Sequence, residues 1–260
     1  MRILIKIGSA LISDGPRIRL PWLAQKIWEI AELIRERSHR VLIVSSGAVA
    51  AGMEMQGLTE RPRDVLELQQ LSGIGQVRLM THYKEFFREW SIAVAQILLT
   101  HHNFSSDRER NTITQIVDAY LSKGVVPIVN ENDMVDKEEF DYQRRFSDND
   151  ILAALVGVNV GVDLAVLLTD VDGLYAADPK KDSSVALIER VERVTPEIEA
   201  MASREGGALG LGGMSSKVIA ARRLTEAGIP TIIASGRHSI PDIVAEKAPS
   251  TRFRAQPVAG

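Results

Sequence analysis

The chain has 260 residues, of which 45% are hydrophobic and 25% charged, and its formal net charge at pH 7 is −3. This composition is typical of a globular protein with enough apolar residues for one large domain or two lobes. The nearly balanced charge gives no reason to expect nucleic acid or an anionic membrane as a partner. Because the chain contains no cysteine, disulfides and thiolate chemistry are excluded, and the cytoplasm is the expected compartment.

Short apolar runs alternate with amphipathic stretches from the first residues onward. Residues 3–7 predict a strand that begins at once, without the pattern of a signal peptide, and residues 22–37 predict a helix. Residues 41–44 predict the next strand and residues 48–53 the next helix. Four more apolar runs, separated by helical patterns, predict strands over residues 92–98, 125–129, 164–168 and 229–234.

Near-continuous Val, Ile and Leu strands that alternate with helices indicate a mostly parallel sheet buried on both faces. We therefore predict an α/β fold, a three-layer αβα sandwich around a mostly parallel central sheet. A polar stretch interrupts the alternation near residue 150, which is the best candidate for a boundary between lobes. Since ligands of such sheets gather at the carboxyl ends of the strands, the residues that follow each strand are candidate site residues.

The first two strands end in small and charged residues. The first ends in Lys6-Ile7-Gly8-Ser9, which places a cation at the expected crevice, although a strand-end lysine can also be a solvated edge residue. The second leads into Ser45-Ser46-Gly47-Ala48 at the start of a helix. Backbone N–H groups there could receive a carboxylate or phosphate, and a capping serine with close helix packing explains this loop equally well.

Later strand ends carry more polar groups. Asn130-Glu131-Asn132-Asp133 follows one strand, and four such residues are more than a turn requires. Ser147-Asp148-Asn149-Asp150 enters a helix and could be an N-cap. Thr169-Asp170-Val171-Asp172-Gly173 could be a tight turn, and it lacks the spacing of a calcium loop.

The run Gly212-Gly213-Met214-Ser215-Ser216-Lys217 precedes the helical pattern of residues 218–224. Glycines let backbone amides turn toward one point, and the following helix directs its unpaired N–H groups the same way. A lysine one turn into a helix is locally unfavourable, but it is expected if a phosphate lies above it. The alternative is an ordinary glycine-containing loop before a helix.

Several common sites are excluded. Lys217 is followed by Val218, so no Walker-type loop is present, and the glycines at 207, 210 and 212 lack dinucleotide-binding spacing. No serine-hydrolase nucleophile elbow occurs. The histidines lack metal-binding helical spacing and are interpreted as surface or packing residues: His39, His82, His101, His102 and His238.

Taken together, in this order and spacing over essentially the whole chain, these motifs resemble the catalytic domain of the glutamate-phosphorylating members of the amino acid kinase family. The resemblance implies ATP-dependent phosphorylation of the γ-carboxylate of L-glutamate to glutamyl 5-phosphate, the first step of proline synthesis. It implies one kinase domain over residues 1–260, with a glutamate-binding lobe over about 1–150 and a nucleotide-binding lobe over about 151–260. It also implies feedback inhibition by proline and a homo-oligomer, either a dimer or a tetramer.

Residue matching within this resemblance implies individual roles. Lys6 and Lys217 would stabilise the transferring phosphoryl group, and Asp150 would orient both lysines. The residues matched to glutamate binding are Ser46, Gly47, Asp133 and Asn149. The residues matched to ATP binding are Thr169, Asp170, Leu211, Gly212, Gly213, Met214, Ser215, Ser216 and Lys217. No residue is matched to a metal, and Mg²⁺ would bind mainly through the ATP phosphates.

The chemistry agrees with these roles. A carboxylate acceptor with a reference pKa of about 4.3 is already ionised at pH 7, so no general base is needed. The site must instead overcome repulsion between a carboxylate and a polyphosphate, which lysines and helix N-termini can do. Asp133 is a suitable partner for the ammonium group of glutamate, and Asn149 can both donate and accept.

Two features depart from the family pattern. The stretch between Asp133 and Asp148 looks a few residues longer than expected, with Ser147 where relatives tend to have glycine. The chain also ends at Gly260, where many relatives continue into a PUA domain, so we expect a kinase domain without one. The alternatives are a sibling kinase acting on acetylglutamate, aspartate, carbamate or UMP, and a non-catalytic sensor, against which Lys6 and Lys217 argue.

Overall fold

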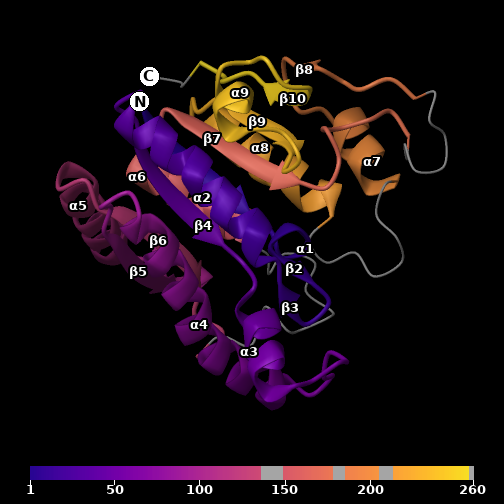
Figure 1. The fold of residues 1–260 in the computed structure, drawn as a ribbon. Coiled ribbons are helices and arrows are strands. Elements are labelled where there is room, and N and C mark those ends of the chain that lie inside the picture. The colour runs from indigo at the N-terminus through magenta and orange to yellow at the C-terminus, as the bar shows by residue number, and fades with distance from the viewer. Residues whose placement is uncertain (136–148, 178–184, 205–212, 258–260) are drawn as a thin grey trace.

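The computed structural model describes residues 1–135, 149–177, 185–204 and 213–257, and Figure 1 shows their arrangement around one central sheet. Within these ranges, eight strands lie in the order β5-β6-β4-β1-β7-β9-β10-β8. Their bounds are β1 Arg2–Ile7, β4 Arg40–Ser45, β5 Val94–Leu99, β6 Val126–Glu131, β7 Leu164–Thr169, β8 Arg190–Val191, β9 Thr231–Ser235 and β10 Ser250–Phe253. The short strands β2 (Ser13–Asp14) and β3 (Arg17–Ile18) pair separately.

Helices connect the strands and cover both faces of the sheet (Figure 1). Their bounds are α1 Ser9–Ile12, α2 Leu20–Arg35, α3 Ala48–Gln56, α4 Val65–Arg88, η1 His101–Phe104, α5 Asp107–Ser122, α6 Asn149–Val160, α7 Pro196–Arg204, α8 Met214–Glu226 and α9 Ile240–Val244. Helices α2, α4 and α9 pack on one face, and α5, α6 and α8 pack on the other. The prediction of an α/β fold with helices on both faces of the sheet is confirmed.

The sheet is mostly parallel, as predicted. The six strands from β5 to β9 pair in parallel, and the antiparallel exception is β10 against β9, which the sequence analysis did not predict. Each predicted strand overlaps an observed one, but β6 extends to Glu131, so Asn130 and Glu131 belong to the strand. The expectation of a sheet buried on both faces does not hold at the edge strand β5, where Gln96 and Leu98 are exposed.

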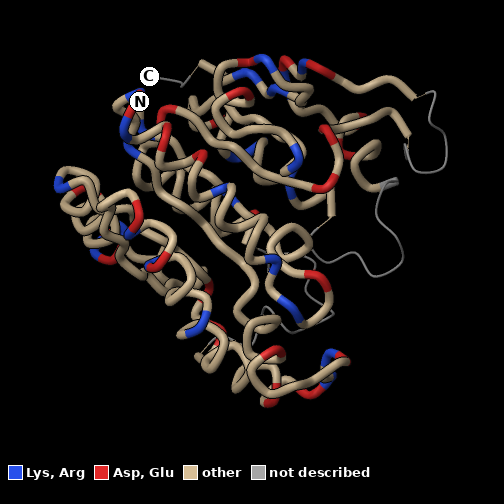
Figure 2. The backbone as a smooth tube through the Cα atoms, in the orientation of Figure 1, with Lys and Arg blue, Asp and Glu red and all other residues tan. Residues whose placement is uncertain are grey.

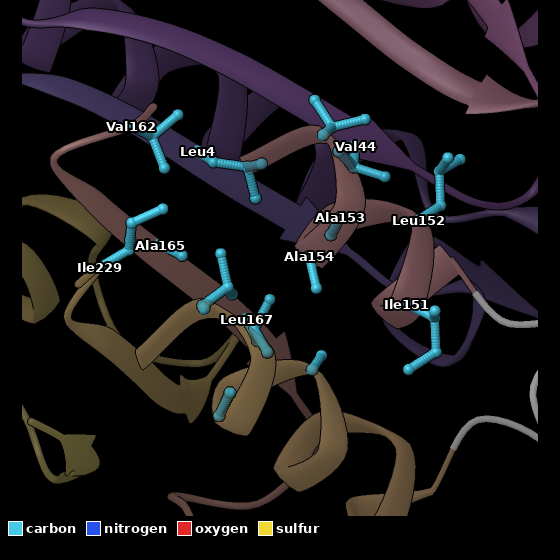
Figure 3. Packing of buried hydrophobic residues seen from close by; sticks show 14 of the residues in the cluster. Leu4, Val44, Ile151, Leu152, Ala153, Ala154, Val162, Ala165, Leu167 and Ile229 are labelled. Atoms are coloured by element: carbon cyan, nitrogen blue, oxygen red, sulfur yellow. The ribbon is translucent and has the colours of Figure 1, made fainter. Parts of the chain in front are cut away.

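The core is divided into two layers by the alternation of side chains along the strands. In β1, Leu4 faces α6 and α8, whereas Ile3 and Ile5 face α2 on the other side. Figure 3 shows Leu4 and Val44 beside Ala153 of α6, where a small side chain allows the helix to lie close to the sheet. This packing fixes the first turn of α6 at the carboxyl ends of β1 and β4.

Charged residues lie mainly on helices and loops, with Lys and Arg interspersed among Asp and Glu (Figure 2). The central strands carry few of them, in keeping with burial of the sheet. Among the described residues, no helix combines the length and apolar character that crossing a membrane requires.

Glycines bring α3 and α4 into direct backbone contact. A Cβ added to Gly52 of α3 would lie 2.0 Å from the Leu71 carbonyl oxygen, and one added to Gly75 of α4 would lie 1.8 Å from the Ala48 carbonyl oxygen. No larger residue can occupy either position at this separation. The contact holds one face of α4 against the start of α3, which follows the carboxyl end of β4.

We expect Gly75→Ala to destabilise the protein, because relieving the overlap has to move α3 away from α4. Overpacking of this kind typically costs about 1–3 kcal/mol, which urea unfolding followed by circular dichroism can measure. Gly15→Ala is the control, since its Cβ would meet nothing within 4 Å and only the positive φ of +55° opposes it. The control should lose about 1 kcal/mol. A Gly75→Ala variant as stable as wild type would contradict the close α3–α4 contact.

Candidate functional site

The predicted site residues that the structure describes lie around the carboxyl ends of β1, β4, β6 and β7. Lys6 is the penultimate residue of β1, Ser46 follows β4, and Thr169 ends β7. Asn149 and Asp150 begin α6, whereas Lys217 lies in the first turns of α8. Because these strands run parallel, their ends meet at one edge of the sheet, as expected.

One aspartate joins two lysines in the buried centre of this site. Lys6 Nζ lies 2.5 Å from Asp150 Oδ1, and Lys217 Nζ lies 3.0 Å from Asp150 Oδ2. Ser216 Oγ donates a third hydrogen bond to Asp150 Oδ2, at 2.9 Å. All three charged side chains are buried, so this group carries one net positive charge away from water. Such a group is suited to bind an anion.

The backbone around the lysines adds further N–H groups. Gly213 precedes α8 and, as a glycine, has no side chain that could accept hydrogen bonds from the first N–H groups of the helix. A Cβ on Gly8 would lie 3.4 Å from Lys6 Nζ, at ordinary contact distance, so the Gly8 backbone lies next to the ammonium group. Lysines and an uncapped helix N-terminus together favour a phosphate-like ligand.

The lysines determine the charge state of Asp150. Burial alone would raise the pKa of this carboxyl, but the charges of Lys217 and Lys6, and their hydrogen bonds to it, outweigh burial. The result is a pKa lowered from 3.8 to about 2. Asp150 is therefore ionised throughout the physiological pH range.

A second cluster of buried polar side chains begins at the neighbouring residue, Asn149. Its Nδ2 donates to Ser46 Oγ at 2.9 Å and to Asn130 Oδ1 at 3.3 Å. Asn130 Nδ2 in turn donates to Gln76 Oε1 of α4 at 2.8 Å. The cluster thus connects the ends of β4 and β6 with the starts of α3 and α6.

Asp133 belongs to the same side of the site. Ser72 Oγ of α4 donates to Asp133 Oδ2, and Gln69 Nε2 donates to the Asp133 carbonyl oxygen at 2.8 Å. Asp133 is buried, and its Oδ1 has no hydrogen-bond partner among the described residues. The free oxygen is suited to a cationic ligand group.

The sequence analysis assigned no role to Gln69, Ser72 or Gln76. All three lie on the inner face of α4 and are buried among apolar residues of the same helix. Polar residues at the helical spacing of a buried face were the available signal, but the spacing alone does not show what that face contacts.

The residues predicted to bind nucleotide lie beside the lysines. Thr169 Oγ1 donates to Asp170 Oδ1 at 3.3 Å at the end of β7. The turn that follows is fixed by β10, because Leu174 N donates to Thr251 Oγ1 at 2.7 Å. Gly213, Met214, Ser215 and Ser216 form the start of α8. Leu211 and Gly212 lie outside the described residues, as do Ser147 and Asp148.

Two histidines make contacts that support the packing interpretation. His82 is buried and stacks on Phe86, with 6.2 Å between ring centroids, and burial lowers its pKa. His238 Nε2 lies 2.8 Å from Asp172 Oδ1, which joins the loops after β9 and β7.

A mostly parallel sheet with a buried lysine pair at its carboxyl edge defines the class: an α/β protein with buried charged groups at the strand ends. The model of the amino acid kinase family matches residues 1–235, and the chain belongs to this family. Curated relatives are glutamate 5-kinases. The enzyme of Paraburkholderia phymatum is 42% identical, and the match covers 99% of this chain and 68% of that enzyme. The enzyme of Paraburkholderia xenovorans is 44% identical, and the match covers 91% of this chain and 62% of that enzyme.

Solved structures of other enzymes share the fold at low sequence identity. Carbamate kinase from Giardia lamblia, bound to AMP-PNP, is 16% identical with a TM-score of 0.65 and matches 97% of this chain and 98% of its own. UMP kinase from Bacillus anthracis is 15% identical with a TM-score of 0.59, and the match covers 98% of this chain and 96% of that kinase. These likenesses show the amino acid kinase fold alone.

We expect Asp150→Asn to destabilise the protein by about 3–5 kcal/mol at neutral pH, because it removes the buried carboxylate that both buried ammonium groups contact. The control is Asp107→Asn, which removes an exposed partner of Arg110 and should cost about 0–1 kcal/mol. Urea unfolding measures both losses. The folded-state pKa of Asp150 is depressed, so its contribution is present above about pH 4 and is lost as the pH falls toward 2. A difference from wild type that does not shrink below pH 4 would contradict this assignment.

Proposed function

We propose that this chain transfers the γ-phosphoryl group of ATP to the γ-carboxylate of L-glutamate. One observation carries the proposal: two consecutive residues connect the two parts of the site. Asn149 belongs to a buried polar cluster that suits an amino acid, and Asp150 holds a buried lysine pair that suits a phosphoryl group. The high identity to glutamate 5-kinases over most of the chain supports glutamate rather than the acceptors of the sibling kinases.

The lysines supply what the reaction needs. A glutamate carboxylate oxygen attacks the γ-phosphorus, the bond from that phosphorus to the β,γ-bridging oxygen breaks, and ADP leaves with its electron pair. Lys6 and Lys217 offset the charge on the transferring group, and Asp150 holds both ammonium groups in place. Because the acceptor is already ionised at pH 7, no residue has to remove a proton.

ATP would lie over the start of α8 and the end of β7. The uncapped N–H groups after Gly213 would receive phosphate oxygens, and Thr169 and Asp170 would contact the nucleoside. Leu211, Gly212, Ser215 and Ser216 keep the nucleotide-binding role that the resemblance implies.

Mg²⁺ would be held mainly by the ATP phosphates. Both carboxylate oxygens of Asp150 are engaged by lysines, so this residue is unsuited as a principal ligand, and Mg²⁺ commonly binds through substrate phosphates and water. When bound, Mg²⁺ would neutralise phosphate charge and orient the polyphosphate.

The remaining expectations stay predictions. They are the two-lobe division near residue 150, the homo-oligomer, feedback inhibition by proline and a cytoplasmic location.

Lys217→Met should lower kcat by about a hundredfold or more while changing the glutamate Kd much less, because the lysine matters most as charge builds up during transfer. Asp150 would keep Lys6 as its partner, so the fold should survive. Lys6→Met should show the same pattern. Lys247→Met, which changes an exposed lysine outside the site, is the control. Unchanged turnover in both site variants would overturn the roles given to the lysines.

The product should be an acyl phosphate, which hydroxylamine converts to a hydroxamate. We expect hydroxamate to form in step with ADP when L-glutamate and ATP are supplied. Omitting glutamate is the control and should abolish both products. ADP release without hydroxamate would show that the acceptor is not a carboxylate.

A further inference from the structure

The orientation of three buried amide side chains is fixed by one backbone N–H group. Glu131 N donates to Asn130 Oδ1 at 2.9 Å, which leaves Asn130 Nδ2 as the donor to Gln76 Oε1. Gln76 Nε2 is therefore the end of that amide that points away from Asn130. Asn149 Nδ2 also donates to Asn130 Oδ1, so Asn149 presents its Oδ1 as the remaining end.

Around these amides, three buried polar atoms have no hydrogen-bond partner among the described residues. They are one donor, Gln76 Nε2, and two acceptors, Asn149 Oδ1 and Asp133 Oδ1. The residues are only 7%, 4% and 5% exposed. Leaving such atoms unpaired costs about 1–3 kcal/mol each, so a ligand with one acceptor group and one donor group would satisfy all three.

The α-carbon of an amino acid carries those two groups, a carboxylate and an ammonium. Asp133 is tied to Ser72, one helical turn before Gln76 on α4, so the acceptor and donor ends lie about 6 Å apart along the helix. Gly75, next to Gln76, packs against Ala48 in the first turn of α3, where Gly47 provides no side-chain cap. The start of α3 therefore lies beside the part of α4 that carries Gln76.

We propose that Gln76 is an additional specificity-determining residue, which donates from Nε2 to the α-carboxylate of the amino-acid acceptor. The inference rests on the proposed function. It assigns the ammonium group to Asp133 Oδ1 and Asn149 Oδ1, so the γ-carboxylate is left to reach the lysines beside Asp150.

The test compares L-glutamate with its α-amide, in which the α-carboxylate is replaced by a carboxamide. In Gln76→Glu a carboxylate would face the substrate's α-carboxylate, and we expect kcat/KM for L-glutamate to fall about a hundredfold. The α-amide can donate to the new carboxylate and should be affected less. The kcat/KM for L-glutamate divided by the kcat/KM for the α-amide should therefore fall at least about tenfold. Gln70→Glu, an exposed position on the same helix, is the control and should leave the ratio unchanged.

Gln76→Met removes the donor without adding charge and keeps the test valid if Gln76→Glu fails to fold. It should lower kcat/KM for L-glutamate about ten- to a hundredfold and affect the α-amide less. The KM for ATP should stay near wild type in either variant, which shows that the phosphoryl site is intact. An equal loss of kcat/KM for both acceptors would overturn the role given to Gln76 but would leave the proposed function intact. A wild type that phosphorylates neither acceptor would instead overturn the proposed function.

Discussion

The structure of the site depends on the burial of two ammonium groups around one carboxylate. An ammonium group in the interior needs a partner, and Asp150 serves Lys6 and Lys217 at once. One strand and two helices from distant parts of the chain must therefore converge on Asp150. Counted over these three side chains alone, the group carries one net positive charge, which suits it to the phosphoryl group of the proposed reaction.

The other half of the site depends on backbone contact rather than charge. Gly52 and Gly75 let α3 and α4 approach more closely than any side chain would allow, and Ser72 and Gln76 of α4 contact residues at the end of β6. Burying the polar side chains of α4 without hydrogen-bond partners would destabilise the fold. Their position is stable because Asp133 and Asn130 provide hydrogen-bond partners.

The sequence predicted most of the residues at the strand ends, because parallel strands bring their carboxyl ends to one edge whatever their separation in the chain. Lys6 could be found in this way, whereas Asn149 and Asp150 begin α6 and Lys217 lies at the start of α8, and their roles came from the family resemblance. Gln76 could not be found, because its helix reaches the site through the α3–α4 contact, which no local pattern encodes. The antiparallel strand β10 was missed for a similar reason: its four residues have no periodicity that distinguishes them from a loop.

The first turn of α6 connects the two halves. Consecutive residues on a helix point about 100° apart, so Asn149 faces Ser46 and Asn130 while Asp150 faces the lysines. The peptide between them sets the spacing of the amino-acid cluster from the phosphoryl site. Close packing of Ala153 against the sheet holds that turn in place, so neither half can shift without moving the other. In the proposed reaction, the alignment of the acceptor with the phosphoryl group would therefore depend on how this one helix packs on the sheet.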